Sequence, residues 1–515
     1  MNLGDLIASS ARAFPDKPAV IFNEEMMTYN QFFSLTACIA AKLAQDGVGP
    51  GDRVAVISKN VPEYLAVFAA CERLGLVVVP INFRLTANEI HYILHESGAR
   101  AVFLHAQAMS GVAEQLKGMS TGIGLWVSWR GEVPDGYRSW SQWLDGGTSA
   151  QFSNWLVVDQ APAYIFYTSG TTGRPKGAVL SHQGQVANAL VMAAELGLQR
   201  EDIALLVMPL HHVGGKWLSL SSLARGATVV IEPDFDLERI GHTVQRWGIT
   251  VTLMAPTMIY RFLKTSDVDI NRLKSLRTIL YSSAPMAPAL LEDGIRTFGN
   301  VFCQVYGSTE SGCATWFSKR EHEEVMASGR YEVLASAGKP SMNADVLILD
   351  DAGNPQPNGR EGELCLKAPW VFSGYWRNRE ATEKAFVQDY LRTGDWARKD
   401  EEGFVYILDR KNDLIISGGE NVYPREVEEL LLSHPAIDEA AVVGVRDEEW
   451  GERVKAFVVL RDGSAVTPAE VVDYCRGKLA GYKRPKEVEI VRELPKNSVG
   501  KVLRRRLREP LGTGQ

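Results

Sequence analysis

Apolar runs of strand length alternate with helical patterns through most of the chain. Arg53 to Ser58 predicts a strand, Val61 to Leu74 a helix, and Gly75 to Pro80 the start of the next strand. A helix over Ala87 to Ser97 and a strand over Ala101 to Leu104 repeat the pattern. Strands separated by helices indicate βαβ units and largely parallel sheets, with binding sites at the C-terminal ends of the strands.

The same alternation returns at three further predicted strands, Thr228 to Ile231, Ile249 to Met254 and Thr278 to Tyr281. Its character changes near Ser336, where short strands lie between turns rich in Gly, Asn and Pro, which is typical of a small antiparallel β subdomain. Beyond Arg410, Pro424 begins an amphipathic helix.

We therefore predict an α/β fold with two domains. The large N-terminal domain, residues 1–410, contains αβ-layered sheets and a β subdomain at about 336–410. A small α+β C-terminal domain follows at 411–515. A chain of 515 residues is also too long for one ordinary hydrophobic core.

Composition and charge narrow the class of protein. An apolar content of 45% and a charged content of 23% are typical of a globular protein, and the net charge of −7 argues against a nucleic-acid binder. Six cysteines without metal-type spacing indicate buried thiols in a reduced, cytoplasmic protein. The N-terminus lacks a signal-peptide pattern, and no apolar segment reaches the roughly 18 residues of a membrane span. Any membrane contact is therefore expected to be peripheral.

The most informative segment is TSGTTGRPKG, Thr168 to Gly177, which follows a predicted buried strand over Ala163 to Tyr167. Small hydroxyl residues and glycines let backbone N–H groups approach phosphate oxygens closely, and Lys176 adds a compact positive charge. An ordinary surface turn is the more common explanation of a glycine-rich loop. The order also differs from the GxxxxGK[ST] loop of common NTPases, because the lysine precedes the last glycine.

Several further segments carry groups suited to a nucleotide. In QVYGSTE, Tyr306 can flank an adenine ring, Thr309 can bond a phosphate and Glu310 can hold Mg²⁺ through an oxygen ligand. In RTGDW and GFVYILDR, Asp395 can accept ribose hydroxyls and Arg410 can bond the ribose or a phosphate. Three other segments, PLHHVGG, YSSAPM and ELPKNSVGKVLR, complete the set.

These segments, in this order and spacing, resemble the AMP-forming acyl-CoA synthetases of the adenylate-forming superfamily, from about Thr28 to Arg506. The resemblance implies ATP, Mg²⁺ and coenzyme A as cofactors. It implies as catalytic residues Lys501, Glu310, Thr309 and His212, and as metal ligands Glu310 and Thr172. It implies as cofactor-binding residues Thr168, Ser169, Gly170, Thr171, Thr172, Gly173, Lys176, Ser283, Ala284, Pro285, Gln304, Val305, Tyr306, Gly307, Ser308, Asp395, Arg410, Ser417, Gly418 and Gly419.

The chain departs from the family pattern at a few positions. His211 replaces an aromatic residue that commonly precedes the histidine, and Ser282 and Ser283 stand where glycines are common. Two adjacent histidines on a strand would point to opposite faces, which argues against a zinc site. We expect Lys216 to be solvated, with contact to an acidic substrate tail as the alternative. Asn412 occupies a hinge position where the family often has Asp or Lys.

The implied reaction has two steps. A carboxylate attacks the α-phosphorus of ATP to give an acyl-adenylate and pyrophosphate, and the CoA thiol then takes the acyl group as AMP leaves. Rotation of the C-terminal domain about a hinge at Arg410 to Asn412 would bring the Ser417 to Gly419 loop to the site, where it would line a pantetheine tunnel. Tyr482, Lys483 and Arg484 are expected near the CoA phosphates.

Two other functions stay open. The acceptor could be a separate carrier protein, although the short stretch after the lysine motif favours CoA, and a regulatory protein without catalysis is disfavoured by the retained Lys176 and Lys501. The basic segment Lys483 to Arg508 predicts either a solvated helix face or attraction of CoA and nucleotide phosphates. The acid is expected to be a medium- or long-chain fatty acid or an aryl or alicyclic carboxylate. Candidate pocket walls, each equally expected in the core, are Trp217, Met254, Met258, Met286 and Trp316. Whether the chain forms a homodimer is left open.

Overall fold

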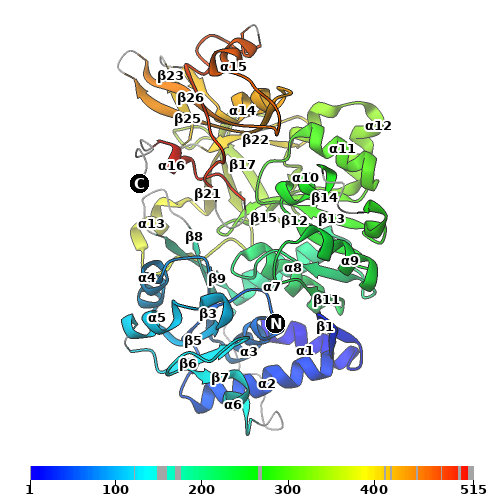
Figure 1. Ribbon diagram of the computed structural model, residues 1–515, viewed down its shortest axis with the longest axis vertical. Helices are drawn as coiled ribbons and strands as arrows, with labels where there is room; N and C mark the ends of the chain where they lie inside the picture. The colour runs from blue at the N-terminus through cyan, green and yellow to red at the C-terminus, as the bar shows by residue number, and fades with distance from the viewer. Residues whose placement is uncertain are drawn as a thin grey trace.

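The computed structural model describes residues 2–120, 122–147, 159–168, 175–264, 269–410, 413–417, 420–447, 450–476, 478–496 and 500–508. In Figure 1 two large sheets lie side by side in the lower and middle part of the molecule, a small antiparallel sheet with β17, β21 and β22 lies above them, and a separate C-terminal sheet lies at the top. The predicted α/β class is confirmed.

The first large sheet has eight strands in the order β19-β9-β8-β4-β3-β5-β6-β7. Its strands β4, β3, β5 and β6 run parallel, and β8 joins β4 in parallel and β9 antiparallel. The predicted strand over Ala163 to Tyr167 lies within β8. The bounds are β3 (Arg53–Ile57), β4 (Val77–Ile81), β5 (Ala99–His105), β6 (Leu125–Trp129), β7 (Arg138–Ser139), β8 (Pro162–Thr168), β9 (Lys176–Ser181) and β19 (Gly374–Tyr375).

The second large sheet has nine strands in the order β16-β15-β14-β13-β12-β10-β11-β1-β2. Strands β1 and β10 to β14 pair in parallel, so their C-terminal ends share one edge. The predicted strands at Thr228 and Thr278 match β11 and β13. The bounds are β1 (Pro18–Phe22), β2 (Glu25–Thr28), β10 (Ile203–Leu206), β11 (Thr228–Ile231), β12 (Val251–Met254), β13 (Thr278–Tyr281), β14 (Phe302–Ser308), β15 (Gly312–Phe317) and β16 (Lys339–Pro340).

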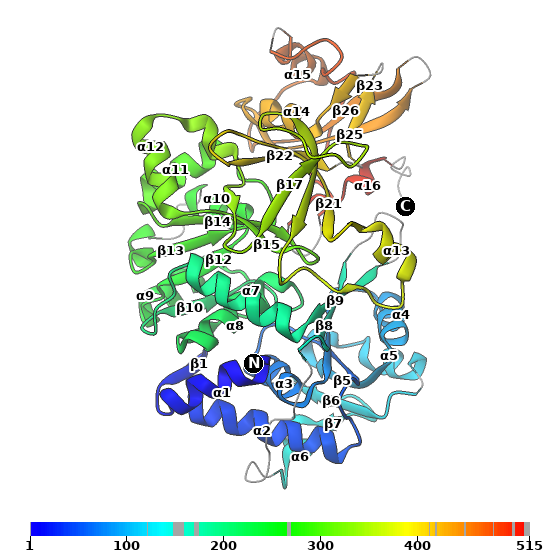
Figure 2. The same ribbon diagram turned by 180° about the vertical axis from the view of Figure 1, so that it is seen from behind.

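Helices join the two large sheets through one apolar core. Helix α3 is buried from Tyr64 to Leu74 on all its faces, including the charged Glu72 and Arg73, and Pro62 and Gly75 begin and end it. Figure 2 shows α1, α2 and α3 lying below α7. The bounds are α1 (Leu3–Ala13), α2 (Tyr29–Gln45), α3 (Pro62–Leu74), α7 (His182–Glu195) and α8 (Val213–Arg225).

The outer faces of the two sheets carry further helices and their own apolar cores. Helix α4 has the predicted bounds. The bounds are α4 (Ala87–Ser97), α5 (Ala113–Met119), α6 (Trp140–Leu144), α9 (Leu237–Trp247), α10 (Pro256–Lys264), α11 (Pro288–Phe298), α12 (Lys319–Ser328) and the 3₁₀ helices η1 (Gln107–Met109), η2 (Ile270–Leu273) and η3 (Tyr331–Ala335).

An antiparallel sheet of five strands occupies most of the region predicted as a β subdomain. The same stretch also contributes β16 and β19 to the two large sheets. The bounds are β17 (Asp345–Leu349), β18 (Glu361–Lys367), α13 (Arg379–Lys384), β20 (Phe386–Val387), β21 (Tyr390–Lys399) and β22 (Val405–Arg410).

The C-terminal part forms its own sheet, in the order β24-β23-β26-β25 with β27 beside β26. It has a separate apolar core, and α16 lies near β21 in Figure 1. The bounds are β23 (Ile415–Ser417), β24 (Glu420–Val422), α14 (Pro424–Leu432), β25 (Ile437–Asp447), β26 (Gly451–Leu460), α15 (Pro468–Tyr474), β27 (Glu487–Ile490) and α16 (Arg504–Arg508).

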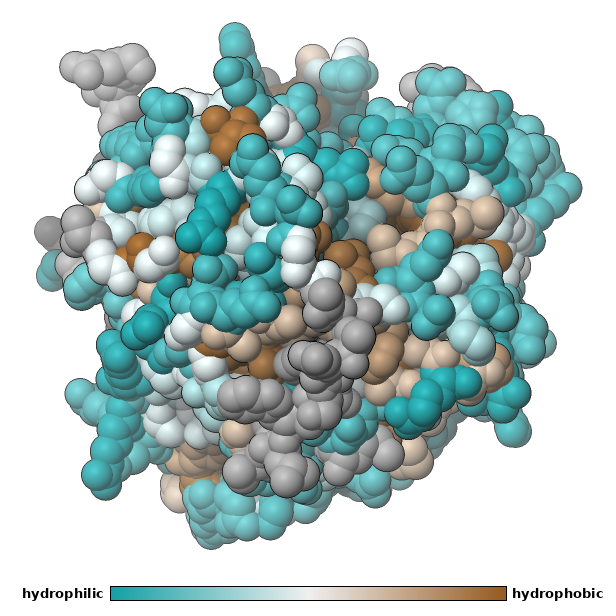
Figure 3. Space-filling view, turned by 90° about the horizontal axis from the view of Figure 1, so that it is seen from below, coloured by the Kyte–Doolittle hydropathy of each residue, from teal (hydrophilic) through white to brown (hydrophobic). Residues whose placement is uncertain are grey.

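The hydropathy of the surface and the burial of the cysteines agree with the globular class inferred from the composition. Figure 3 shows apolar residues in separate groups among hydrophilic ones on the face seen from below. Within the described ranges, no helix has the length and apolar character to cross a bilayer. Five cysteines are buried and Cys38 is half-buried, all as free thiols.

Candidate active site

The predicted site segments gather at the C-terminal ends of parallel strands. Thr168 ends β8, His211 and His212 follow β10, and Ser283 follows β13. Thr309 and Glu310 lie in the turn between β14 and β15. This is the edge at which open α/β sheets bind their ligands.

Asp395 and Arg410 form an ion pair in this region, in which the carboxylate is buried and the guanidinium is partly exposed. They lie opposite each other in β21 and β22, and Arg410 Nε is 2.8 Å from Asp395 Oδ1. The Tyr306 hydroxyl donates to Asp395 Oδ2, and Asp395 is only 4% exposed. Asp395 is also the main cause of a raised pKa of Arg410. An ionised carboxylate has about four acceptor positions, so acceptor positions remain for two hydroxyl groups.

Glu310 joins the strand before the glycine-rich loop to β19. Its Oε1 accepts a hydrogen bond from Thr168 Oγ1 at 3.1 Å and another from the Tyr375 hydroxyl at 3.2 Å. Lys176 Nζ lies 5.3 Å from the centre of the Tyr375 ring. Burial and Glu310 raise the pKa of Tyr375, so the hydroxyl keeps its proton and donates. Carboxylate oxygens are the ligands that Mg²⁺ prefers, so Glu310 fits the metal.

Sequence reasoning missed Tyr375. It contacts Glu310 across 65 residues of chain, and no motif spacing in the sequence connects the two. Only the pairing of β19 with β9 brings Tyr375 next to the strand that carries Lys176.

Part of the predicted site lies outside the described residues: Ser169, Gly170, Thr171, Thr172, Gly173, Lys411, Asn412, Gly418 and Gly419. Ser417 is described and is buried at the end of β23, where it pairs with Gly451 of the same C-terminal sheet. No described contact joins Ser417 to the Asp395 cluster.

Lys501 reaches the Asp395 cluster from the C-terminal part. Its pKa is lowered, first by the protein packed around the amino group and then by the positive charge of Arg410, while Asp395 acts in the opposite direction. Gly500 has φ +83°, and a Cβ there would lie 3.2 Å from Thr257 Oγ1. A glycine therefore fits where the lysine loop meets α10.

His211 and His212 lie in a turn, not on a strand, so the expectation of opposite faces is wrong. His212 caps the N-terminus of α8, and the two ring centres are 4.7 Å apart. Burial and then Arg84 lower the pKa of His212 to about 4, so its imidazole is neutral at pH 7.

The remaining predicted residues surround the same edge. Gln304 Oε1 accepts from Tyr281, and the Ser308 N–H donates to Ser311 Oγ at 2.7 Å. Val305 belongs to an apolar core with Trp217 and Trp316. Gly307 packs directly against Gly312, since a Cβ would lie 1.8 Å from the Gly312 carbonyl oxygen. Ala284 is half-buried and Pro285 exposed, both in the turn after β13.

The expectation for Lys216 is wrong, and the expectation for the basic segment Lys483 to Arg508 stays a prediction. Lys216 is neither solvated nor open to a substrate, because its side chain is 3% exposed and its Nζ lies 2.7 Å from Glu72 Oε1. Arg504 and Arg508 form ion pairs with acidic residues of the C-terminal part, Arg504 with Glu428 at 2.7 Å and Arg508 with Asp413 at 2.8 Å. These two guanidinium groups are therefore engaged by carboxylates.

Ser283 has φ +75°, a left-handed conformation that costs a non-glycine residue about 1 to 2 kcal/mol. This explains why glycine is common at this position. We expect Ser283→Gly to raise the free energy of unfolding and Ser282→Gly to lower it, because Ser282 is not left-handed and glycine adds about 0.5–1 kcal/mol of unfolded-state entropy. Thermal unfolding of both variants should separate them by about 1 kcal/mol, and equal midpoints would contradict the explanation.

The sequence matches the family described as AMP-binding enzyme over residues 7–376 and the AMP-binding enzyme C-terminal domain over residues 426–501. It is 35% identical to a feruloyl-CoA synthase of Amycolatopsis sp, over 99% of both chains. It is 34% identical to the fatty acid–[acyl-carrier-protein] ligase ScoC of Streptomyces coeruleorubidus, over 96% of this chain and 93% of that protein.

A solved structure shares the fold. The crystal structure of ATP-bound MatB from Rhodopseudomonas palustris superimposes with a TM-score of 0.88 at 30% identity, over 99% of both chains. The resemblance inferred from the motifs is confirmed. The chain belongs to the family of AMP-binding enzymes and is an adenylate-forming acyl-CoA ligase.

Proposed function

We propose that this ligase activates an aryl, alicyclic or medium- to long-chain carboxylic acid with ATP and transfers the acyl group to the thiol of CoA at the site around Asp395, Arg410 and Lys501. The observation that carries this proposal is the ion pair of Arg410 with the buried Asp395, together with the Gly500 to Lys501 segment of the C-terminal part, which packs against Thr257 of α10. In this proposal the small C-terminal domain, residues 411–515, supplies the lysine.

Each of these residues has a separate role in the formation of the acyl-adenylate. Asp395 holds the ribose hydroxyls, and Tyr306 flanks the adenine. The Lys501 ammonium group neutralises the charge that builds up on the α-phosphate as the carboxylate oxygen attacks the phosphorus. The glycine-rich loop from Thr168 to Lys176 holds the β- and γ-phosphates. Mg²⁺ supplies further positive charge at the phosphates when bound, and Glu310 would hold it.

In the second step the thiol attacks the acyl carbonyl, and AMP leaves with the electron pair of the broken C–O bond. Lys501 has no role in this step, so the C-terminal domain turns away after adenylation. His212 lies at the N-terminus of α8 next to the site, where its neutral imidazole contributes to the acyl pocket. The free thiols support a cytoplasmic location. A homodimer stays a prediction.

A carrier protein is the alternative to CoA as the acceptor of the acyl group. One relative is named as a ligase for an acyl carrier protein, while another is named as a CoA synthase, and both match over nearly the whole chain. AMP release should be measured with ATP, Mg²⁺ and a panel of acids, with and without CoA. The panel contains acetate, fatty acids of increasing length, benzoate, cinnamates and a dicarboxylate. CoA-dependent turnover supports the proposal, whereas pyrophosphate release without CoA-dependent turnover points to a carrier protein.

Two hydrogen bonds between side chains hold the C-terminal part in its present position. The Tyr260 hydroxyl of α10 donates to Asp438 of β25, and the Tyr423 hydroxyl donates to Glu361 of β18 at 2.6 Å. If the domain turns between the two steps, both bonds are lost. We expect Tyr260→Phe to slow adenylation about 2- to 10-fold, equal to roughly one hydrogen bond, without slowing the second step.

The measurement is single-turnover kinetics of each step separately. Tyr390→Phe is the matched control, because Tyr390 donates to Asp345 within one sheet and that bond does not depend on the domain position. An equal slowing of both steps by Tyr260→Phe would show that Tyr260 acts on general stability.

A further inference from the structure

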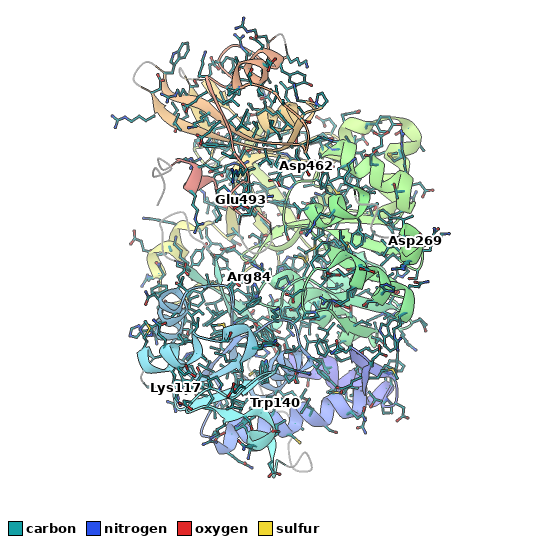
Figure 4. All side chains as sticks on the ribbon, in the orientation of Figure 1. Arg84, Lys117, Trp140, Asp269, Asp462 and Glu493 are labelled. Carbon is teal, nitrogen blue, oxygen red and sulfur yellow. The ribbon has the colours of Figure 1, made fainter. Side chains whose placement is uncertain are left out.

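A cavity of about 60 Å³ lies beside His211, between the two large sheets. It opens where β3, β4, β10 and β11 end, and Phe83, Arg84 and Met258 are among its lining residues. Figure 4 labels Arg84 near the middle of the molecule. This volume holds a few water molecules or a small polar group, since one water occupies about 30 Å³ of the liquid.

His211 is the unusual member of the lining. It is 7% exposed, and neither ring nitrogen has a hydrogen-bond partner among the residues that the structure describes. The Phe83 ring packs edge-on against it, with ring centres 5.9 Å apart. A buried polar group without a partner is costly and calls for an occupant that supplies one.

The neighbouring polar side chains have partners already. Asn60 donates to the carbonyl oxygens of Met208 and Glu232 and accepts from the Leu210 N–H. Ser58 donates to the Lys59 carbonyl oxygen and accepts from Trp129. His211 is therefore the group left to bind what enters the cavity.

The charges around the cavity restrict the kind of chemical group that can occupy it. Lys59 forms an ion pair with Asp234 at 2.7 Å, so their charges cancel, and the exposed Arg84 adds one positive charge at the cavity. Burial, His212 and Arg84 all lower the pKa of His211, so its imidazole is neutral and offers one N–H donor and one acceptor. An oxygen that accepts a hydrogen bond fits this surrounding, and a cationic group does not.

The cavity borders the proposed active site. The ring of His211 lies against that of His212. Met258 follows Thr257 directly, and Thr257 is the residue that Gly500 meets next to Lys501. A substituent of the bound acid can therefore reach His211 from the position of the reacting carboxylate.

We propose that His211 donates a hydrogen bond to an oxygen substituent of the acid, so that the enzyme prefers carboxylic acids with a hydroxyl group or a second carboxylate over unsubstituted ones. This inference rests on the proposed function and names the substrate class of the same site. An unsubstituted acid leaves the imidazole unpaired, which reduces kcat/KM about 10- to 100-fold relative to the oxygenated acid.

The test compares matched acids. Hexanoate, 6-hydroxyhexanoate and adipate form one series, and cinnamate, 4-hydroxycinnamate and 4-carboxycinnamate form the other. For wild type, His211→Phe and His211→Gln, kcat and KM are measured for each acid and for CoA. Phenylalanine restores the aromatic type common in the family, and glutamine keeps a hydrogen-bond donor.

We expect wild type to prefer one oxygenated member of a series, and the preferred member shows whether the group is a hydroxyl or a carboxylate. His211→Phe should lose this preference, so that its ratio of kcat/KM between the oxygenated and the unsubstituted acid falls to about one, and His211→Gln should retain part of it. A wild-type preference for unsubstituted acids, an unchanged preference in His211→Phe, or an effect on the KM of CoA alone would overturn the inference.

A failure of the proposed function gives a different experimental result from a failure of the inference about His211. If wild type turns over no acid of either series, calorimetric binding of the same acids in the presence of α,β-methylene-ATP still tests His211. Tighter binding of the oxygenated acid to wild type than to His211→Phe supports the inference, and equal binding overturns it.

Discussion

Replacing Lys501 with alanine should slow acyl-adenylate formation about 10²- to 10³-fold and leave the transfer of the acyl group from adenylate to CoA nearly unchanged. The charges of Arg410 and Asp395 both act on the pKa of Lys501, and the adjacent Gly500 packs against Thr257 of α10. Loss of one group that stabilises charge in the transition state commonly has an effect of this size.

The two half-reactions are measured separately. ATP–pyrophosphate exchange reports adenylation, and thioester formation from purified acyl-adenylate and CoA reports the transfer. Because Lys501 acts only at the α-phosphate in this proposal, the defect should appear in kcat of exchange more than in the KM of the acid.

The same motif supplies a control. Lys496 lies five residues before Lys501 and forms an ion pair with Glu439 at 2.6 Å on the surface of the C-terminal part. Lys496→Ala should leave the exchange rate near the wild-type value. A loss of both half-reactions in Lys501→Ala, or an equal loss in Lys496→Ala, would remove Lys501 from its proposed role.

Local sequence patterns predicted much of the fold because they depend on neighbouring residues. The helix over Ala87 to Ser97 and the strands over Thr228 to Ile231 and Thr278 to Tyr281 have the predicted bounds. Their apolar periodicity and flanking turn residues mark them without tertiary information. The observed strand β8 extends the predicted strand over Ala163 to Tyr167 by only one residue at each end.

The site was less predictable where its contacts join distant parts of the chain. The motifs indicated Asp395 and Arg410 individually, but only the pairing of β21 with β22 sets them opposite each other. Tyr375 gave no signal because its partner Glu310 is far away in sequence. The nucleotide roles of the motif residues stay predictions.

Lys216 shows most clearly why a prediction about a single side chain can be wrong. A lysine directly after a glycine pair has no local signal of burial, and lysines are rarely buried unless paired. Its partner Glu72 lies in α3, directly after the apolar run YLAVFAAC and before Arg73 and Leu74. A carboxylate that directly follows such an apolar run in one helix was the available signal for a buried ion pair.

That pair gives the largest expected effect on stability. Glu72 is 1% exposed and also accepts a hydrogen bond from the Tyr164 hydroxyl of β8, while Lys216 lies over the Phe68 ring at 4.7 Å. Lys216→Met leaves the carboxylate buried without its counter-charge. We expect the free energy of unfolding to fall by about 3–5 kcal/mol, since removing one partner of a buried pair leaves an uncompensated charge.

The double variant Glu72→Met with Lys216→Met separates the charge from the packing. If the unpaired charge causes the loss, replacing both partners with apolar side chains of similar length restores most of the stability or exceeds the wild type. Thermal unfolding of the two variants and wild type measures these changes in stability. Lys384→Met is the control, because Lys384 and Glu380 form an exposed ion pair at 2.6 Å that should contribute no measurable free energy of unfolding. A double variant as unstable as Lys216→Met would show that methionine cannot fill the space, and that shape rather than charge holds α8 against α3. Recovery would show instead that the buried ion pair contributes little net stability and that each charge serves mainly to compensate the other.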